Sequence, residues 1–173
     1  MKKRLTLLFV LLIGISLLSI FLLGGCSSGN SDENGNKANK RDAKAEADVK
    51  QVVEGFGKAL QNVSLQGPAE DVKQSMQENY GEYVAPDLLE RWYAEPLKAP
   101  GRLTSSPWPD RIEIQKVERL AEEAYKVDGE IIEITSADKE NEVAVKREIT
   151  LVVENMEGKW LIITTNIRDA EEE

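Results

Sequence analysis

The residues that could carry out chemistry in this chain are limited by what the sequence lacks. Its 173 residues include one cysteine and no histidine. Histidine is the commonest general base and the commonest transition-metal ligand, and a nucleophilic serine or cysteine needs such a base beside it. The single cysteine, Cys26, can form no disulfide within the chain. We therefore expect no catalytic triad, no metal site and no cofactor.

Acid–base chemistry without histidine would depend on tyrosines and carboxylates. The available donors and acids near apolar runs are Tyr80, Tyr83, Tyr93, Tyr125, Asp87 and Asp128. Their spacing forms no recognisable site, and tyrosines at helical spacing are typical of a core or its rim. We predict no catalytic residue and no enzymatic activity.

The surroundings of Cys26 indicate a different role for its sulfur. A basic start, "MKKR", precedes an apolar run from Leu5 to Leu23, and small residues follow. This order is typical of a secretory signal peptide. The segment "LGGC", which ends at Cys26, resembles the lipobox of bacterial lipoproteins. The resemblance implies that Cys26 carries a diacylglyceryl group with fatty acids such as palmitate, and that signal peptidase II cuts between Gly25 and Cys26.

An alternative is that the apolar run is kept as a transmembrane anchor, because it approaches the roughly 20 residues that span a bilayer. Both interpretations place the rest of the chain outside the cytoplasm. They differ in whether residues 1–25 remain. The lipoprotein interpretation predicts a protein held by its lipid on the extracytoplasmic face of the cell membrane, in a Gram-positive bacterium.

Two polar segments flank the predicted domain at 45–168. Residues 26–44 are rich in Ser, Asn, Gly, Asp and Lys, a composition that cannot bury enough surface to order a chain. We expect a flexible linker there, and a solvated acidic tail at 169–173.

The first half of the domain has helical periodicity. Over 43–63, apolar residues recur every three or four positions, which predicts one long amphipathic helix. A second helix is expected from Pro68, with a break near Gly81. A third should begin at Pro86 and end before Pro96.

The second half, after Asp110, alternates as strands do. The apolar phase shifts at Asp128–Gly129, which favours a bulge in one long strand over a tight hairpin. The segment "MEG", 156–158, separates two further apolar runs and predicts an antiparallel hairpin.

Helices followed by about four strands predict an α+β fold, with the helices packed on one face of a bent antiparallel sheet. This order resembles the NTF2-like (cystatin-like) superfamily, over residues 45–168. The resemblance implies a sheet wrapped around the long helix as a cone with an open mouth. Enzymes of that superfamily use an Asp or His inside the cone. A plain antiparallel sheet crossed by helices remains the alternative.

Three aromatic residues are candidates for binding: Trp108, Tyr83 and Trp92. Trp108 stands between two prolines, which hold it in an extended link at low entropic cost. We predict that it plugs the end of the core. The alternative is an exposed anchor for a partner or ligand at the cone mouth.

Two functions remain open. The first is a lipid-anchored, non-enzymatic binding or scaffold module of the cell envelope, with an envelope protein as partner. The second is a small-molecule pocket protein or an NTF2-like enzyme. A filled cone favours the first and an open apolar pocket the second. The net charge of -9 argues against nucleic acid as a partner.

Overall fold

The computed structural model describes residues 32–136 and 143–168. The predicted signal peptide at 1–25, the cleavage site at Gly25, the lipid site at Cys26 and the tail at 169–173 lie outside these ranges. Within the ranges described, no helix combines the length and the apolar character needed to cross a membrane.

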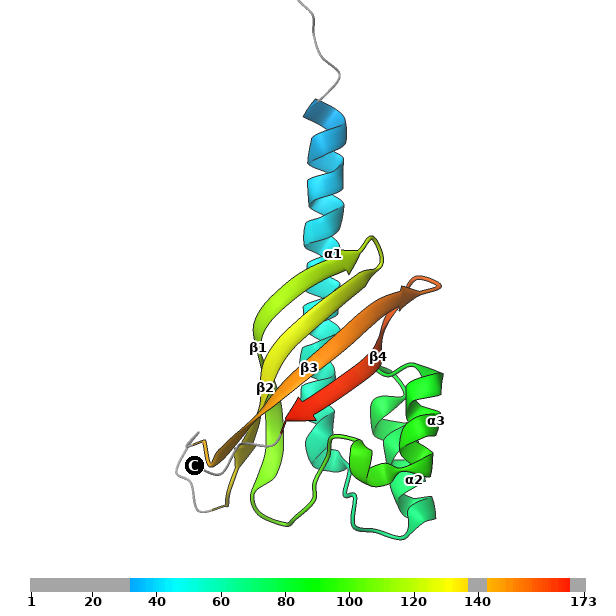
Figure 1. The fold of residues 1–173 in the computed structure, drawn as a ribbon, viewed down its shortest axis with the longest axis vertical. Coiled ribbons are helices and arrows are strands. Elements are labelled where there is room, and N and C mark those ends of the chain that lie inside the picture. The colour runs from blue at the N-terminus through cyan, green and yellow to red at the C-terminus, as the bar shows by residue number, and fades with distance from the viewer. Residues whose placement is uncertain (1–31, 137–142, 169–173) are drawn as a thin grey trace, which may run out of the picture.

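In the part of the chain that the structure describes, three helices precede four strands, in the predicted order. The helices are α1 (Asp32–Ala59), α2 (Ala69–Tyr80) and α3 (Pro86–Ala94), with 3₁₀ turns η1 (Leu60–Asn62) and η2 (Pro96–Lys98). The strands are β1 (Trp108–Ala121), β2 (Ala124–Ile134), β3 (Val145–Met156) and β4 (Lys159–Arg168). They pair antiparallel in chain order. Figure 1 shows the sheet curving in front of α1, with α2 and α3 beside β4, so the α+β prediction is confirmed.

Helix α1 packs as its apolar stripe predicted. Val49, Val53 and Phe56 are fully buried on the side that faces the sheet. Burial of side chains of this size is worth about 1.5–3 kcal/mol each. The stripe therefore anchors the helix against the concave face of the sheet.

The same helix begins earlier than predicted. Residues 32–44, which the composition assigned to the flexible linker, are helical. Lys, Arg and Ala favour a helix, and extending a helix that packing has already nucleated costs little. An ion pair of 2.9 Å between Asp42 and Arg119 of β1 also ties this part of α1 to the sheet. The linker prediction is therefore corrected for residues 32–44.

The bulge predicted at Asp128–Gly129 is wrong in its place, because the irregularity lies in the neighbouring strand. Strand β2 is continuous and pairs with β3 without a break, so the hairpin alternative at Asp128–Gly129 is wrong. The register instead shifts in β1 between Ile114 and Lys116, opposite Gly129 and Asp128. Gly129 faces the core, where a β-carbon would lie 2.7 Å from the carbonyl oxygen of Glu113. The glycine thus permits close approach of β1 rather than forming the bulge.

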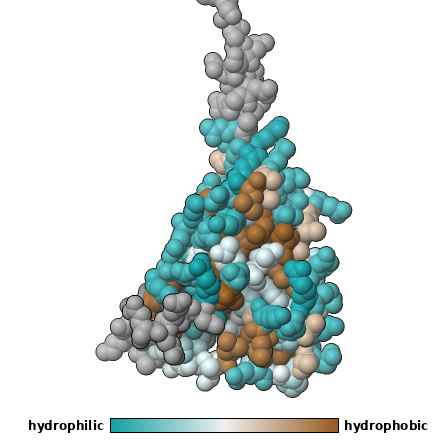
Figure 2. Space-filling view, in the orientation of Figure 1, coloured by the Kyte–Doolittle hydropathy of each residue, from teal (hydrophilic) through white to brown (hydrophobic). Residues whose placement is uncertain are grey.

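Side chains fill the space between α1 and the sheet. The buried strand residues of this core cluster are Ile112, Tyr125, Val127, Ile131, Ile149, Leu151, Val153 and Ile162. The outer face of the sheet carries alternating charges, such as the pairs Lys116–Glu118 and Lys146–Glu130. On the face shown in Figure 2, hydrophilic residues cover most of the surface and hydrophobic ones form separate patches.

Candidate binding clefts beside the last strand

The three aromatic residues singled out from the sequence do not form one site. Trp92 lies in the core with 3% of its surface exposed. Tyr83 lines a small cleft of about 280 Å³ between α1 and the β3–β4 turn. Trp108 opens β1, is partly exposed and lies outside the core cluster of the described residues. The prediction that Trp108 plugs the core is therefore wrong: its ring is not fully buried and does not belong to the cluster of core residues.

Trp92 belongs to an aromatic cluster that closes the core under α3. Its ring stacks on Phe56 with centroids 6.2 Å apart and meets Tyr80 edge-on at 5.9 Å. Phe56 and Tyr80 are themselves in edge contact at 5.0 Å. Such pairs add about 0.5–1.5 kcal/mol beyond burial. The cluster holds α2 and α3 against α1.

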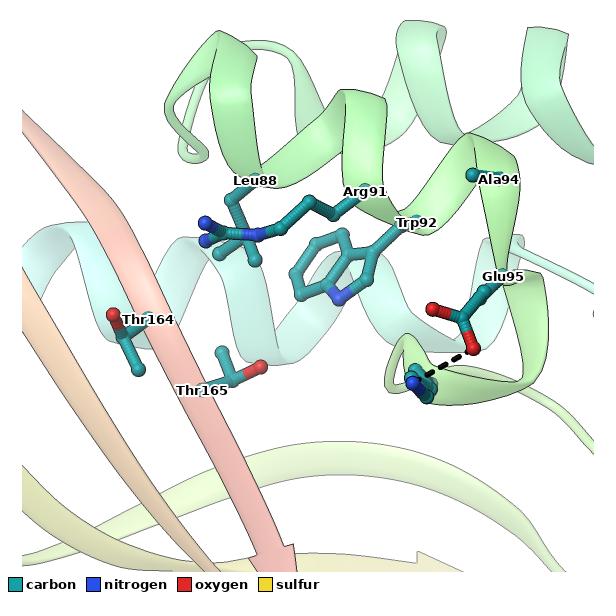
Figure 3. Close-up of a pocket in the computed structure, with 8 residues that line it drawn as sticks. Leu88, Arg91, Trp92, Ala94, Glu95, Thr164 and Thr165 are labelled. Carbon is teal, nitrogen blue, oxygen red and sulfur yellow. Dashed lines mark ion pairs between the residues drawn. The ribbon is translucent and has the colours of Figure 1, made fainter.

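One edge of the Trp92 indole faces a cleft between α3, η2 and β4 (Figure 3). The cleft has a volume of about 480 Å³. Its lining residues are Leu88, Arg91, Trp92, Ala94, Glu95, Lys98, Thr164 and Thr165. We call it the α3–β4 cleft.

Hydrogen-bond donors dominate the α3–β4 cleft. Arg91 donates from Nη2 to the carbonyl oxygen of Ile163 at 3.1 Å, and its other guanidinium N–H groups have no partner among the described residues. The Trp92 indole N–H has no hydrogen-bond partner among the described residues. Glu95, the one acid of the lining, is paired with Lys98 at 2.7 Å. The cleft therefore suits a ligand that presents oxygen acceptors.

A second cleft lies on the other side of Arg91. It has a volume of about 430 Å³ and shares Leu88, Arg91 and Thr164 with the first. The remaining lining residues are Ala85, Pro86, Asp87, Glu154, Met156 and Ile163. Met156 is 44% exposed, so this end offers apolar surface together with two carboxylates. We call it the Met156 cleft.

The candidate acid–base residues are dispersed. Tyr80 is buried and donates its hydroxyl to the carbonyl oxygen of Pro100 at 2.7 Å, and burial raises the pKa of its phenol. Asp128 lies on the outer face of the sheet. A hydrogen bond from Lys126 holds the pKa of its carboxyl below the ordinary value, and Thr150 also donates to it at 2.9 Å. This setting is the opposite of the desolvated, high-pKa acid that such catalysis requires.

No group of three or more metal-ligating side chains occurs among the residues that the structure describes. The other tyrosines make different, unrelated contacts. The Tyr93 hydroxyl donates to Gln77 at 2.6 Å, and the Tyr125 ring packs against Trp160. The described tyrosines and carboxylates thus form no common acid–base site.

Sequence reasoning missed the polar lining of the α3–β4 cleft. Arg91 and Lys98 are ordinary surface residues by type, although their position beside Trp92 and between prolines was a weak signal. Thr164 and Thr165 gave no signal, because a register shift between Val152 and Val153 decides which β4 side chains turn inward.

Comparison with protein-family models gives no match, and comparison with curated proteins gives none either. Similar solved structures include a protein of unknown function from Bacteroides thetaiotaomicron VPI-5482, with 12% identity and a TM-score of 0.41, covering 79% of this chain and 99% of that one. An NTF-2-like protein of unknown function from Shewanella oneidensis MR-1 has 14% identity and a TM-score of 0.42, covering 72% and 98%. An NTF2-like protein involved in plasmid conjugation has 12% identity and a TM-score of 0.35. The similarity covers 93% of this chain and 50% of that protein. At these TM-scores the similarity is one of general architecture.

Proposed function

We propose that this chain is an NTF2-like, non-enzymatic binding module, anchored through lipid on Cys26 to the outer face of a Gram-positive cell membrane. Its partner is an envelope protein, which it binds at the clefts beside β4. The proposal combines an anchor inferred from the sequence with a binding surface inferred from the geometry.

The anchor is supported by the order of features before α1. A basic start, an apolar run and the segment that ends at Cys26 come directly before the helix that begins at Asp32. Two acyl chains on one cysteine would meet the two-signal requirement for stable membrane attachment. The domain would then hang from the membrane through α1.

The filled interior is the observation that favours binding over catalysis. Phe56 and Leu60 are fully buried, Trp92 nearly so, and the inward-facing strand residues close on them. This packing occupies the space between α1 and the sheet that an enclosed substrate would need. The clefts lined by described residues beside β4 open at the surface instead, where a partner can reach them.

A small-molecule site is the second candidate, and one observation favours it. The α3–β4 cleft, at about 480 Å³, falls in the usual range of ligand pockets. It contains the Trp92 indole N–H, which no described residue accepts. Its lining is more polar than that of a typical drug-sized pocket, and it shares Leu88, Arg91 and Thr164 with the Met156 cleft. We therefore favour a macromolecular partner.

The test is site-specific photo-crosslinking in intact cells. A photoreactive amino acid replaces Leu97, which is 73% exposed in η2 beside the cleft, and in a matched strain Leu120, which is 54% exposed at the end of β1. We expect one discrete, light-dependent adduct at the Leu97 position only. The Thr165→Trp substitution, which fills the cleft, should abolish it. Identical adducts at both positions, or none at either, would contradict the proposal.

A further inference from the structure

One edge of the sheet is already used for strand pairing, but only in part. Strand β4 is an outer strand, and the segment 83–85 pairs with it in parallel at Ile162. The Ile162 N–H donates to the Tyr83 carbonyl at 2.8 Å, and the Ala85 N–H donates to the Ile162 carbonyl at 2.9 Å. Pro86 then starts α3 and takes the chain away from the edge.

Beyond Ile162 the edge has one partner among the described residues. Arg91 donates to the carbonyl oxygen of Ile163. Residues 164–168 continue the strand, paired with β3 on their inner side and with no described strand on their outer side. An open edge of this kind is a template for an added strand, because its outward backbone groups lack partners.

Both clefts contact β4 where its open edge begins. Thr164 and Thr165 line the α3–β4 cleft, and Ile163 and Thr164 line the Met156 cleft. The register shift between Val152 and Val153 leaves Ile163 as an extra residue in β4, so neighbouring side chains of this segment can lie on one side of the strand. Figure 3 shows Arg91 and Trp92 of α3 directed toward this side of β4.

The α3–β4 cleft and the Met156 cleft share Leu88, Arg91 and Thr164, and we call the two together the groove. The charged and apolar residues differ between its two ends. At the α3–β4 end, Lys98 and Arg91 line the cleft, and Lys98 forms an ion pair with Glu95. The indole N–H of Trp92 lies there too and has no acceptor among the described residues. At the Met156 end, exposed apolar surface is joined by Asp87 and Glu154. The basic end would attract a carboxylate, although the chain as a whole is acidic.

We propose that the groove between α3 and β4 binds an extended peptide segment of the partner protein, which adds as a strand to the β4 edge at residues 164–168. An acidic side chain of that segment faces Lys98 and Arg91, and an apolar side chain contacts Met156. This inference rests on the proposed function, for which it specifies how the partner is recognised.

The test uses the full-length chain in mild detergent and an immobilised library of random octapeptides. Selection should enrich peptides that carry an apolar residue and, a few positions away, Asp or Glu. With a selected peptide bound, amide hydrogen exchange should slow at residues 164–168. Slowed exchange confined to other strands, or selection with no acidic preference, would contradict strand addition at this edge.

Charge reversal provides the matched comparison. Lys98→Glu should weaken the selected peptide by about tenfold or more, and a peptide with its acid changed to Lys should recover binding to that variant. Lys116→Glu reverses an equally solvent-exposed lysine on the outer face of β1 and should change affinity by less than about twofold. Equal losses in both variants would show that only overall charge matters and would overturn the proposed register.

Failure of this inference can be distinguished from failure of the proposed function. A cleft-dependent adduct in cells without slowed exchange at residues 164–168 leaves the binding module in place and removes strand addition. Slowed exchange at residues 164–168 in a protein that carries no lipid on Cys26 would support the peptide site and contradict the membrane anchor. Self-association that competes with the peptide would identify a second copy of the chain as the occupant and contradict a separate partner.

Discussion

Gly57 of α1 lies against the backbone of Ile112 in β1, so closely that a β-carbon at Gly57 would be 2.6 Å from the Ile112 nitrogen. No side chain fits there unless the helix and the strand move apart. The contact therefore sets how near α1 approaches the sheet, and it explains why a glycine stands inside a long helix.

Substitution of Gly57 by Ala should destabilise the fold. Overpacking against the backbone costs about 1–3 kcal/mol of stability. Replacing glycine by alanine inside a helix stabilises it by only about 0.5–1 kcal/mol. Gly55→Ala is the informative neighbour, because its β-carbon would meet the ring of Tyr83, which can turn away. Thermal unfolding should rank Gly57→Ala below Gly55→Ala and below the control Gly67→Ala, whose β-carbon finds ordinary contact at 3.5 Å. A Gly57→Ala protein as stable as the wild type would contradict the close contact.

Trp92 and Trp108 should differ sharply in their effect on stability. Trp92→Ala removes a ring from the buried aromatic cluster, which should cost about 3–5 kcal/mol and lower the melting temperature by roughly 8 °C or more. Trp108→Ala removes a partly exposed ring outside the core cluster and should lower it by less than about 4 °C. Calorimetry of the two variants measures the difference. Equal shifts would restore the role of core plug for Trp108.

Tyr80 should make stability fall at alkaline pH. Burial raises the pKa of Tyr80 above its ordinary value of 10.0, so the folded protein holds the phenol proton more tightly than the unfolded chain does. That stabilisation is fully present below pH 10.0 and is lost as the pH rises further, by about 1.4 kcal/mol per pH unit.

The Tyr80→Phe variant separates this effect from a general alkaline loss. At neutral pH it should be less stable by about 1–3 kcal/mol, because the Pro100 carbonyl loses its donor. Above pH 10.0 its stability should fall less steeply than that of the wild type. Burial also raises the pKa values of Tyr93 and Tyr125, so some decline should remain. Urea unfolding on both sides of that pH gives the slopes, and equal slopes would contradict titration of Tyr80.

The early start of α1 can be tested with proline. Ala43→Pro, at an exposed position, should break the helix before the buried stripe begins and reduce helical circular dichroism. The melting temperature should stay nearly constant, because Val49 and the residues after it keep their contacts with the sheet. Unchanged circular dichroism would mean that residues 32–44 form the irregular linker that their composition suggested.

Local patterns in the sequence predicted the elements well where periodicity or proline decides the structure. The stripe through Val53 and Phe56 located α1, Pro86 located the start of α3, and "MEG" located the β3–β4 turn, where Glu157 and Gly158 adopt positive φ. Each of these signals acts over a few neighbouring residues, so tertiary context does not alter it.

The misplaced features depend on contacts between distant segments. Asp128–Gly129 suggested a bulge in its own strand, but the extra residue lies in β1. The apparent change of phase arises because Ile132 is buried as fully as Ile131, although the two side chains point to opposite faces of β2. The lining of the α3–β4 cleft likewise requires α3, η2 and the shifted end of β4 to meet. No spacing within one segment could have predicted Thr165 or Lys98.

The membrane anchor can be checked by the mass of the N-terminal peptide of the protein purified from bacterial membranes. We expect a peptide that begins at Cys26 and carries a diacylglyceryl group, with no peptide from residues 1–25, and we expect Cys26→Ser to abolish the modification. An unmodified Cys26 within an intact chain that begins at Met1 would contradict the lipid anchor on which the proposed function depends.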